Sequence, residues 1–284
     1  MQRFVGRSSG VTARTRPKRK PATEHVEGVY NSRLQKGGAL LEDMRLLVRH
    51  WQNAAPNGQQ ALIVAENLLG KHTRARVADT LRYAFLPRFI NGRPPQAWKL
   101  VRALEDRNLP VEVLRPVYYW ITARNERLLY YFVHTELLHR SKHQGQNIKT
   151  DEVCSWITAQ LVPCGKLWSH TVTTKVAQGV LAALRDFGIL EGTVKKRIAP
   201  VYLPVESFAY IAFALQQEGA SGLHLVQHHD WCLFLFSPPV VEHMFLEADR
   251  HGLLRFQAAG KIVRIDFPAY SFEEMADVVA ARAH

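Results

Sequence analysis

The pattern of apolar and polar positions predicts a chain that is mainly α-helical. In the segment GALLEDMRLLVRHW, apolar residues recur at helical spacing and the charged residues lie away from them. The same period continues to about residue 142, interrupted by the loop-forming stretches PNG, GKHT, NGRPP and NLP. The later helices are expected at about 59–69, 74–90, 96–108, 111–123 and 126–140. We therefore expect a helical bundle over residues 30–142.

A second pattern begins after the polar stretch 141–150, which is the best candidate for a domain boundary. Two amphipathic helices are expected there, and the second follows Ser169 and ends at Gly188. Two short apolar pieces around the basic tripeptide at 195–197 then predict a β-hairpin. Two helices followed by a basic hairpin are the parts of a winged-helix-like unit, here residues 150–204. Such a unit can bind DNA, but it can also serve as a spacer or docking surface.

The construction is then repeated. RDFGILEGTVKKRIAPVYLPVESF is matched by DRHGLLRFQAAGKIVRIDFPAYSF at an offset of 64 to 68 residues, which pairs Gly188 with Gly252 and Ser207 with Ser271. Residues 205–284 are therefore expected to form a second winged-helix-like unit. The helix ahead of its hairpin has an acidic face made of Glu242, His243, Glu247 and Asp249. Because this face repels phosphate, we expect the second unit to serve the structure or a protein partner.

Charge is unevenly distributed along the chain. The formal net charge of +12 divides into +7 in residues 1–38, +8 in 39–149 and −3 in 150–284. A basic first half attracts a polyanion through the release of counterions. Residues 1–29 are expected to be a basic flexible leader. It can be interpreted as a transit peptide, a nucleic-acid arm or a merely solvated segment.

Other patterns restrict the compartment and the chemistry. Three cysteines without metal-type spacing favour a reducing compartment, so we expect a cytoplasmic protein. No apolar run approaches the roughly 20 residues of a membrane helix, so no membrane partner is expected. His224 and His228 lie one helical turn apart, but without an HExxH pattern they are better interpreted as surface or hydrogen-bonded histidines than as zinc ligands. The sequence contains no P-loop, dinucleotide or nucleophile-elbow motif, and we expect no catalytic residues, no metal and no cofactor.

Basic and polar residues of the leader, the bundle and the first winged-helix-like unit are the candidate contacts to nucleic acid. They are Arg14, Arg16, Lys18, Arg19, Lys20, Arg33, Lys36, Arg74, Arg76, Thr173, Thr174, Lys175, Lys195, Lys196 and Arg197. Contacts of this type to phosphate position a protein on nucleic acid and give modest sequence discrimination.

Two long segments resemble the BrxA family of bacterial BREX phage-exclusion systems. They are YNSRLQKGGALLEDMRLLVRHW at 30–51 and LPRFINGRPPQAWKLVRALEDRNLPVEVLRPVYYWITAR at 86–124, and the similarity continues to about residue 200. The resemblance implies a mainly helical, non-enzymatic cytoplasmic component that is associated with DNA binding, with an N-terminal part like the antitermination factor NusB. It also implies work alongside a methyltransferase, an ATPase and a phosphatase-like subunit in defence and in marking host DNA. It carries over no catalytic residues.

The sequence therefore predicts a non-catalytic DNA-binding accessory component of a BREX phage-defence system that supports phage exclusion and host DNA methylation. Its expected partners are double-stranded DNA and other BREX subunits. Two alternatives stay open, because a basic helical bundle can bind RNA and basic residues can also dock acidic proteins in a scaffold.

Overall fold

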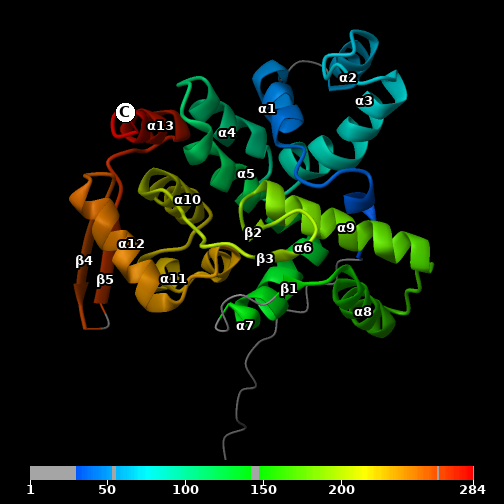
Figure 1. Cartoon of the computed structure of the whole chain (residues 1–284). Coiled ribbons are helices and arrows are strands. Elements are labelled where there is room, and N and C mark those ends of the chain that lie inside the picture. Colours follow the sequence, from blue (N-terminus) through cyan, green and yellow to red (C-terminus); the bar gives the residue numbers. More distant parts are fainter. Residues whose placement is uncertain (1–29, 53–55, 142–146, 261, 284) are drawn as a thin grey trace, which may run out of the picture.

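The computed structural model describes residues 30–52, 56–141, 147–260 and 262–283 and is mainly α-helical, as the sequence predicts (Figure 1). Within these residues, strands occur in a small three-stranded sheet and in a two-stranded hairpin. In the same part of the chain, no helix combines the length and the apolar character needed to cross a membrane.

The N-terminal helices have bounds close to those that the periodicity predicts. They are η1 (Arg33–Gln35), α1 (Leu41–His50), α2 (Pro56–Ala65), α3 (Arg74–Thr80), η2 (Leu81–Ile90), α4 (Ala97–Glu105), α5 (Val111–Asn125), α6 (Arg127–Phe132), η3 (Val133–Leu137) and α7 (Leu138–Arg140). The single helix predicted over 74–90 continues from α3 into η2, a π-helix that contains Pro87. Pro87 has no N–H to donate, so the backbone hydrogen-bond ladder lacks one donor at this position.

The middle part of the chain contains two long helices and the three-stranded sheet. Its elements are β1 (Asn147–Ile148), α8 (Thr150–Leu161), η4 (Val162–Cys164), α9 (His170–Asp186), β2 (Leu190–Glu191) and β3 (Lys196–Ile198). The strands are antiparallel in the order β1-β3-β2. α9 starts after Ser169, whose hydroxyl accepts a hydrogen bond from the Val172 N–H. It ends at Gly188, with φ at +81°, where the Ile189 N–H donates to the Leu184 carbonyl at 2.8 Å.

The C-terminal part repeats the last steps of this order, a long helix followed by a two-stranded antiparallel hairpin. It contains α10 (Val205–Gln217), α11 (Gly222–Val226), η5 (His229–Phe234), α12 (Pro238–Arg250), β4 (Arg255–Ala259), β5 (Ile262–Asp266) and α13 (Phe272–Ala280). α12 ends as α9 does, because Gly252 has φ at +67° and the Leu253 N–H donates to the Ala248 carbonyl at 2.9 Å. An antiparallel hairpin, β4 with β5, and a further helix then follow, as after α9.

The predicted pairing of Ser207 with Ser271 is wrong. Ser207 lies inside α10, and its buried hydroxyl donates to the Val113 carbonyl at 2.7 Å. Ser271 precedes α13 as its N-cap, and its hydroxyl accepts from the Glu274 N–H at 3.1 Å. The two serines therefore occupy different positions relative to the start of their helices.

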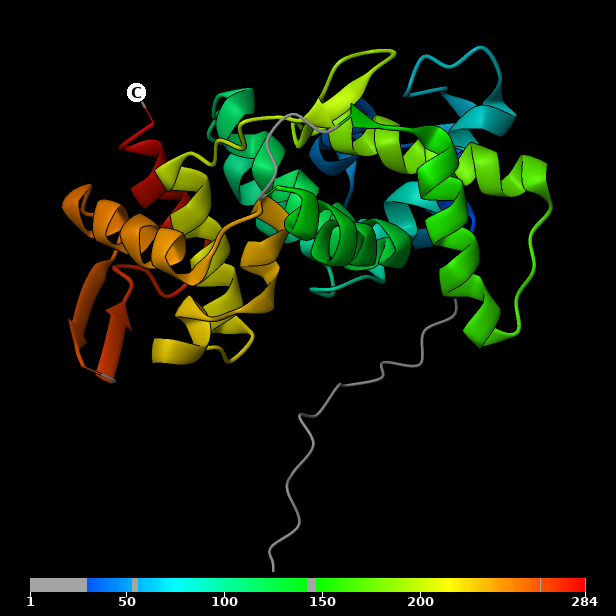
Figure 2. The same cartoon turned by 60° about the horizontal axis from the view of Figure 1, so that its bottom comes forward.

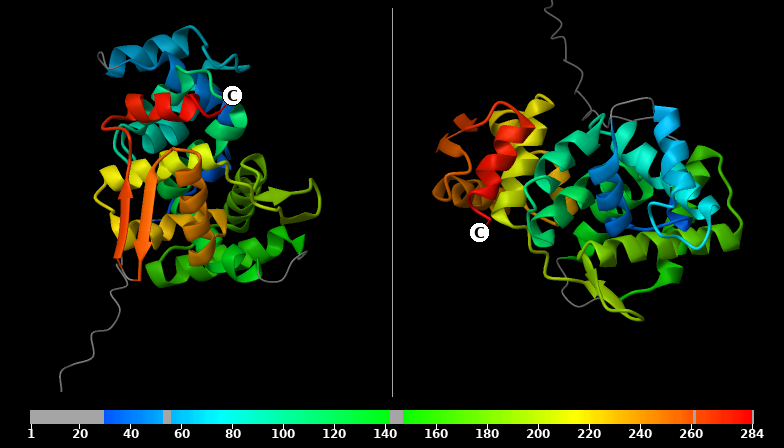
Figure 3. Two further views of the ribbon diagram at one scale, coloured as in Figure 1. Left: turned by 90° about the vertical axis from the view of Figure 1, so that its left-hand side faces the viewer. Right: turned by 90° about the horizontal axis from the view of Figure 1, so that it is seen from above.

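A continuous apolar core joins the three parts of the chain. α5 packs on α10 and α4 packs on α13, so C-terminal helices cover one side of the N-terminal bundle (Figure 1, Figure 3). The ring of Tyr119 on α5 lies 5.3 Å from that of Phe187 after α9 and 5.6 Å from that of Phe234 on η5. One side chain thus touches all three parts. The division into units 30–142, 150–204 and 205–284 stays a prediction.

Candidate nucleic-acid interface

The three-stranded sheet gathers basic side chains around the hairpin that joins β2 to β3. Lys196 and Arg197 lie in β3, and Lys195 lies in the turn before it. β1 pairs with β3 so that Ile148 is opposite Lys196. Extending this antiparallel register by one residue places Lys149 opposite Lys195. We call Lys149, Lys195, Lys196 and Arg197 the hairpin patch.

The hairpin patch is open to solvent and has little compensating negative charge. Lys149, Lys195 and Arg197 are exposed, and the hairpin projects from the body of the molecule (Figure 2, Figure 3). Arg197 forms an ion pair with Glu191 across the hairpin. Neither Lys149 nor Lys195 has a side-chain partner among the residues that the structure describes. Two ammonium groups are therefore available to an anionic ligand.

Lys149 is the member of the hairpin patch that the sequence did not identify as a candidate. β1 has only two residues, and its partner in the sheet lies about fifty positions later, so no local pattern reveals the pairing. One signal was present, since Ile148 is the single apolar residue in the stretch SKHQGQNIKT. Its side chain is 4% exposed, so β1 is anchored to the core through Ile148.

α9, which contains the candidate contacts Thr173, Thr174 and Lys175, is covered on one side by the N-terminal segment. A Cβ atom at Gly179 would collide with the Leu34 carbonyl, and one at Gly38 would lie 3.1 Å from the Ala183 nitrogen. α9 also packs against α8. We call its exposed polar residues, which follow one another at helical spacing, the α9 stripe: Thr171, Lys175, Gln178 and Arg185. Arg185 pairs with the adjacent Asp186, so Lys175 is the available cation of the stripe in the described structure.

Thr173 and Thr174, two of the candidate contacts to nucleic acid, are buried or half-buried by the packing of α9. Thr173 is 6% exposed, and its hydroxyl donates to the Ser169 carbonyl at 3.2 Å. Thr174 is half-buried, and its hydroxyl oxygen lies 3.9 Å from Cys154 Sγ on α8. The pattern indicated one buried stripe, whereas α9 is packed on two sides by α8 and η1. Thr173 is therefore not accessible as the candidate contact that the sequence indicated, while Lys175 is exposed.

Several arginines of the basic N-terminal half hold the fold together. Arg33 Nη2 donates to the Asn125 carbonyl at 3.0 Å. Arg45 and Arg49 both form ion pairs with the carboxylate of Glu105, which is 3% exposed. A count of charges along the sequence does not separate such arginines from those that are free to bind a ligand.

The other candidates of the bundle lie near η1 and α3. Lys36 Nζ pairs with Asp79 at 3.1 Å and lies 5.7 Å from the centre of the Tyr83 ring. Arg74 and Arg76 are exposed in the first turn of α3 and have no side-chain partner among the described residues. The candidates in the leader lie outside the described residues: Arg14, Arg16, Lys18, Arg19 and Lys20.

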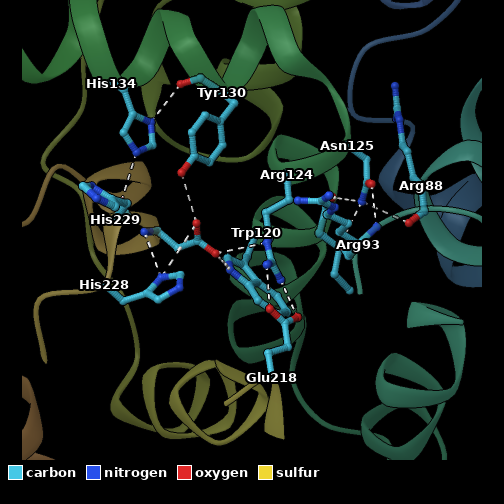
Figure 4. A network of polar contacts seen from close by, with 12 residues as sticks. Arg88, Arg93, Trp120, Arg124, Asn125, Tyr130, His134, Glu218, His228 and His229 are labelled. Atoms are coloured by element: carbon cyan, nitrogen blue, oxygen red, sulfur yellow. Dashed lines mark hydrogen bonds and ion pairs between the residues drawn. The ribbon is translucent and has the colours of Figure 1, made fainter. Parts of the chain in front are cut away.

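The histidine-rich segment of the sequence belongs to a buried polar network rather than to the hairpin patch (Figure 4). Asp230 on η5 is 3% exposed and accepts hydrogen bonds from Trp120 Nε1 at 2.7 Å and from the Tyr130 hydroxyl at 3.2 Å. Arg124 Nε lies 3.1 Å from the same carboxylate, and its two Nη atoms donate to Glu218 at 2.7 Å. Burial is the main cause that raises the pKa of Tyr130 above its ordinary value, so its hydroxyl stays a donor. The network ties α5 and α6 to η5 and α10.

Two histidines, His228 and His134, form hydrogen bonds with backbone groups of residues in or next to this network. His228 Nδ1 accepts a hydrogen bond from the Asp230 N–H at 3.2 Å. His134 bridges the carbonyls of Tyr130 and His229, at 2.9 and 3.0 Å. His224, by contrast, is exposed on α11. Across the described residues, no three His, Cys, Asp or Glu side chains come together in a way that could hold a metal ion.

The acidic face of α12 is partly engaged within the protein. Glu247 pairs with Arg250, and Asp249 accepts a hydrogen bond from the Phe256 N–H at 3.3 Å. Glu242 is exposed and has no side-chain partner in the described part of the chain. The contrast between a basic first hairpin and an acidic second helix is therefore smaller than the sequence indicates, and it depends mainly on Glu242.

A comparison of the sequence with models of known protein families gives a match. Residues 28–214 match the family described as BrxA, which is more than half of the chain and includes the bundle, the hairpin patch and α9. A search of curated proteins finds no match. The matched region contains both segments, 30–51 and 86–124, whose sequences resemble BrxA. Because the match covers more than half of the chain, the protein belongs to the BrxA family.

Proposed function

We propose that this protein is a non-catalytic, duplex-DNA-binding component of a BREX phage-defence system, supporting phage exclusion and host DNA methylation. Its family is associated with BREX phage defence. The hairpin patch carries the DNA-binding part of the proposal, because three cations of the β2–β3 hairpin and the adjacent Lys149 lie together, with Glu191 as the carboxylate paired to Arg197. Phosphate groups of nucleic acid are the anions that such a cluster binds through counterion release.

The order of elements around the patch supports a winged-helix interpretation. A strand, two helices and a β-hairpin follow one another as β1, α8, α9, β2 and β3, with β1 completing the sheet. In this arrangement the second helix faces a groove while the hairpin contacts the backbone beside it. The α9 stripe supplies Lys175 and Gln178 for that groove. Because so few side chains are exposed on α9, we expect phosphate contacts to dominate and sequence discrimination to be modest.

Salt dependence tests the proposal. Binding of labelled duplex DNA by the full chain should weaken with rising KCl, with a log–log slope of about −0.9 for each phosphate neutralised. Replacing Lys149, Lys195, Lys196 and Arg197 together by alanine should reduce both the affinity and the slope. The matched control is the second hairpin, where Arg255 and Arg264 are also exposed and are replaced by alanine with little expected effect. A flat salt dependence, or equal losses in the two variants, would contradict the proposal.

A protein-docking scaffold is the second candidate function. α12 exposes Leu246 at 43% one helical turn after the unpaired carboxylate of Glu242, and Val240 at 40% on another side of the helix. Apolar side chains beside an acidic group suit a protein partner better than phosphate. An intact interaction with other BREX subunits, together with no binding to any nucleic acid, would favour this candidate.

RNA binding is distinguished from duplex-DNA binding by competition. Unlabelled duplex DNA, single-stranded DNA and structured RNA are added in turn to the labelled complex at one salt concentration. Duplex DNA should compete best. If RNA competes better than duplex DNA at equal phosphate concentration, the RNA alternative replaces the DNA part of the proposal.

A further inference from the structure

The turn of the first hairpin presents an apolar side chain next to the hairpin patch. Val194 lies between β2 and β3 and is 90% exposed. The other turn residues are Gly192, Thr193 and Lys195, so Val194 is the one aliphatic side chain of the turn. A valine this exposed contributes almost nothing to the core of the protein, because burial of its methyl groups is what stabilises a fold.

The backbone of the turn is held in one shape. Gly192 has φ at +90°, and a Cβ atom there would collide with the Lys195 carbonyl, so the turn requires glycine. Lys196 Nζ donates to the Thr193 carbonyl at 3.0 Å, and Arg197 pairs with Glu191 at the base of the turn. Val194 is therefore presented by a preorganised hairpin, and little conformational entropy is lost when it meets a ligand.

The surroundings of Val194 indicate what kind of ligand would cover it. The neighbouring side chains Lys195 and Lys196 and the facing Lys149 are cationic. A complementary surface has anionic edges and a less polar floor. The minor groove of duplex DNA has this chemistry, since phosphates line its rims and base edges form its floor. It is about 6 Å wide, too narrow for an α-helix, and β-ribbon proteins are known to reach it with strands.

We infer that Val194 is a minor-groove wedge: the turn enters the minor groove, the lysines contact phosphates on its two rims, and the valine presses against a base step and bends the duplex. Apolar side chains that enter the minor groove in this way partly unstack a step and kink DNA toward the major groove. The inference rests on the proposed duplex-DNA binding and adds the groove, the contacting residue and a deformation of the DNA. It favours A·T-rich sites with flexible steps, where the deformation costs least.

Val194→Ser tests the wedge without removing a charge. Binding is measured by fluorescence anisotropy on an A·T-rich duplex of about 25 base pairs, and bending by energy transfer between dyes at its two ends. The variant should bind about three- to tenfold more weakly and bend the duplex less, while the salt slope stays unchanged because every phosphate contact is retained. Val194→Leu should keep both the affinity and the bend. Netropsin, which occupies the minor groove, should displace the wild-type protein.

Ile262→Ser is the matched control, because Ile262 is 75% exposed beside the turn of the second hairpin. It should bind and bend the duplex as the wild type does. Salt-dependent binding by the wild type, combined with no effect of Val194→Ser or no competition by netropsin, would overturn the wedge and leave the proposed function intact. No binding of duplex DNA by the wild type at low salt would overturn both.

Discussion

Arg88 Nε donates to Glu126 Oε1 at 2.9 Å, and the two side chains are 0% and 2% exposed. Glu126 lies at the break between α5 and α6, where it ends one helix and precedes the next. Arg88 comes from η2 and also donates to the Gly38 carbonyl at 3.0 Å. A single buried ion pair thus connects the segment before α1, the π-helix and the helix break at the centre of the bundle.

Replacing Glu126 by glutamine should destabilise the protein strongly. The substitution keeps the shape of the side chain but leaves the buried guanidinium of Arg88 without a countercharge, which costs about 3 to 5 kcal/mol of unfolding free energy. Urea unfolding followed by circular dichroism measures the change. Asp266→Asn is the control, because the Arg264–Asp266 pair is solvent-exposed and should contribute less than about 1 kcal/mol. Equal effects of the two substitutions would contradict this ranking.

Gly179→Ala should destabilise the contact between α9 and η1. The added methyl group meets the Leu34 carbonyl, and backbone atoms must shift to admit it, at a cost of about 1 to 3 kcal/mol. Gly58→Ala on α2 offers the opposite case, since its Cβ would meet no atom within 4 Å. There alanine should stabilise the helix by about 0.5 to 1 kcal/mol. Thermal unfolding of both variants gives the comparison, and a stabilised Gly179→Ala protein would be inconsistent with the contact.

Acidification should weaken the Asp230 network through His228. Burial lowers the pKa of His228 below its ordinary value, an effect larger than the opposing attraction of Asp230. The unfolded chain therefore binds the proton more readily than the folded chain, and stability is lost as the pH falls below about 6.5. Unfolding free energies are compared at about pH 7.5 and 5.5 for the wild type and for His228→Asn. In this variant the asparagine side-chain oxygen can still accept a hydrogen bond from the Asp230 backbone N–H. The variant should lose less stability on acidification, and an identical loss would show that other groups govern the response.

Glu242→Lys should leave the fold intact and slightly raise non-specific affinity for duplex DNA. Glu242 is exposed and unpaired in the described structure, so the change removes a repulsive charge without breaking a contact. Glu247→Lys is less informative, because it also breaks the ion pair with Arg250. Association with other BREX subunits should weaken in Glu242→Lys if α12 docks a protein partner. Unchanged DNA affinity and unchanged association would assign no role to this face.

Features with a local cause could be predicted from the sequence. Ser169 caps α9 and Gly188 ends it, because both depend on backbone groups within one turn of the helix. The helices of the bundle follow from apolar spacing for the same reason. The helices α9 and α12 end with the same hydrogen-bond pattern because each is followed by a glycine, Gly188 or Gly252.

Features that depend on distant residues could not be predicted. The burial of Thr173 accompanies the packing of α9 on two sides, and the second side is supplied by a segment that lies well over a hundred positions earlier in the chain. Lys149 joins the hairpin patch through a strand of two residues that has no periodicity of its own. The role of Arg33 in holding the fold depends on a carbonyl in α5, which its position in a basic segment does not reveal.

The close contact between Gly179 and Leu34 has an evolutionary consequence. The side of α9 that carries Gly179 packs closely against Leu34, so residues on that side cannot contact a ligand. Mutations can therefore change the ligand-facing side chains of α9 at only a few positions, chiefly Thr171, Lys175 and Gln178. A relative with the same contact has little room to acquire a new base preference on this helix. Diversification among such proteins should therefore concentrate in the hairpin turn, where Thr193 and Val194 can change without disturbing the core.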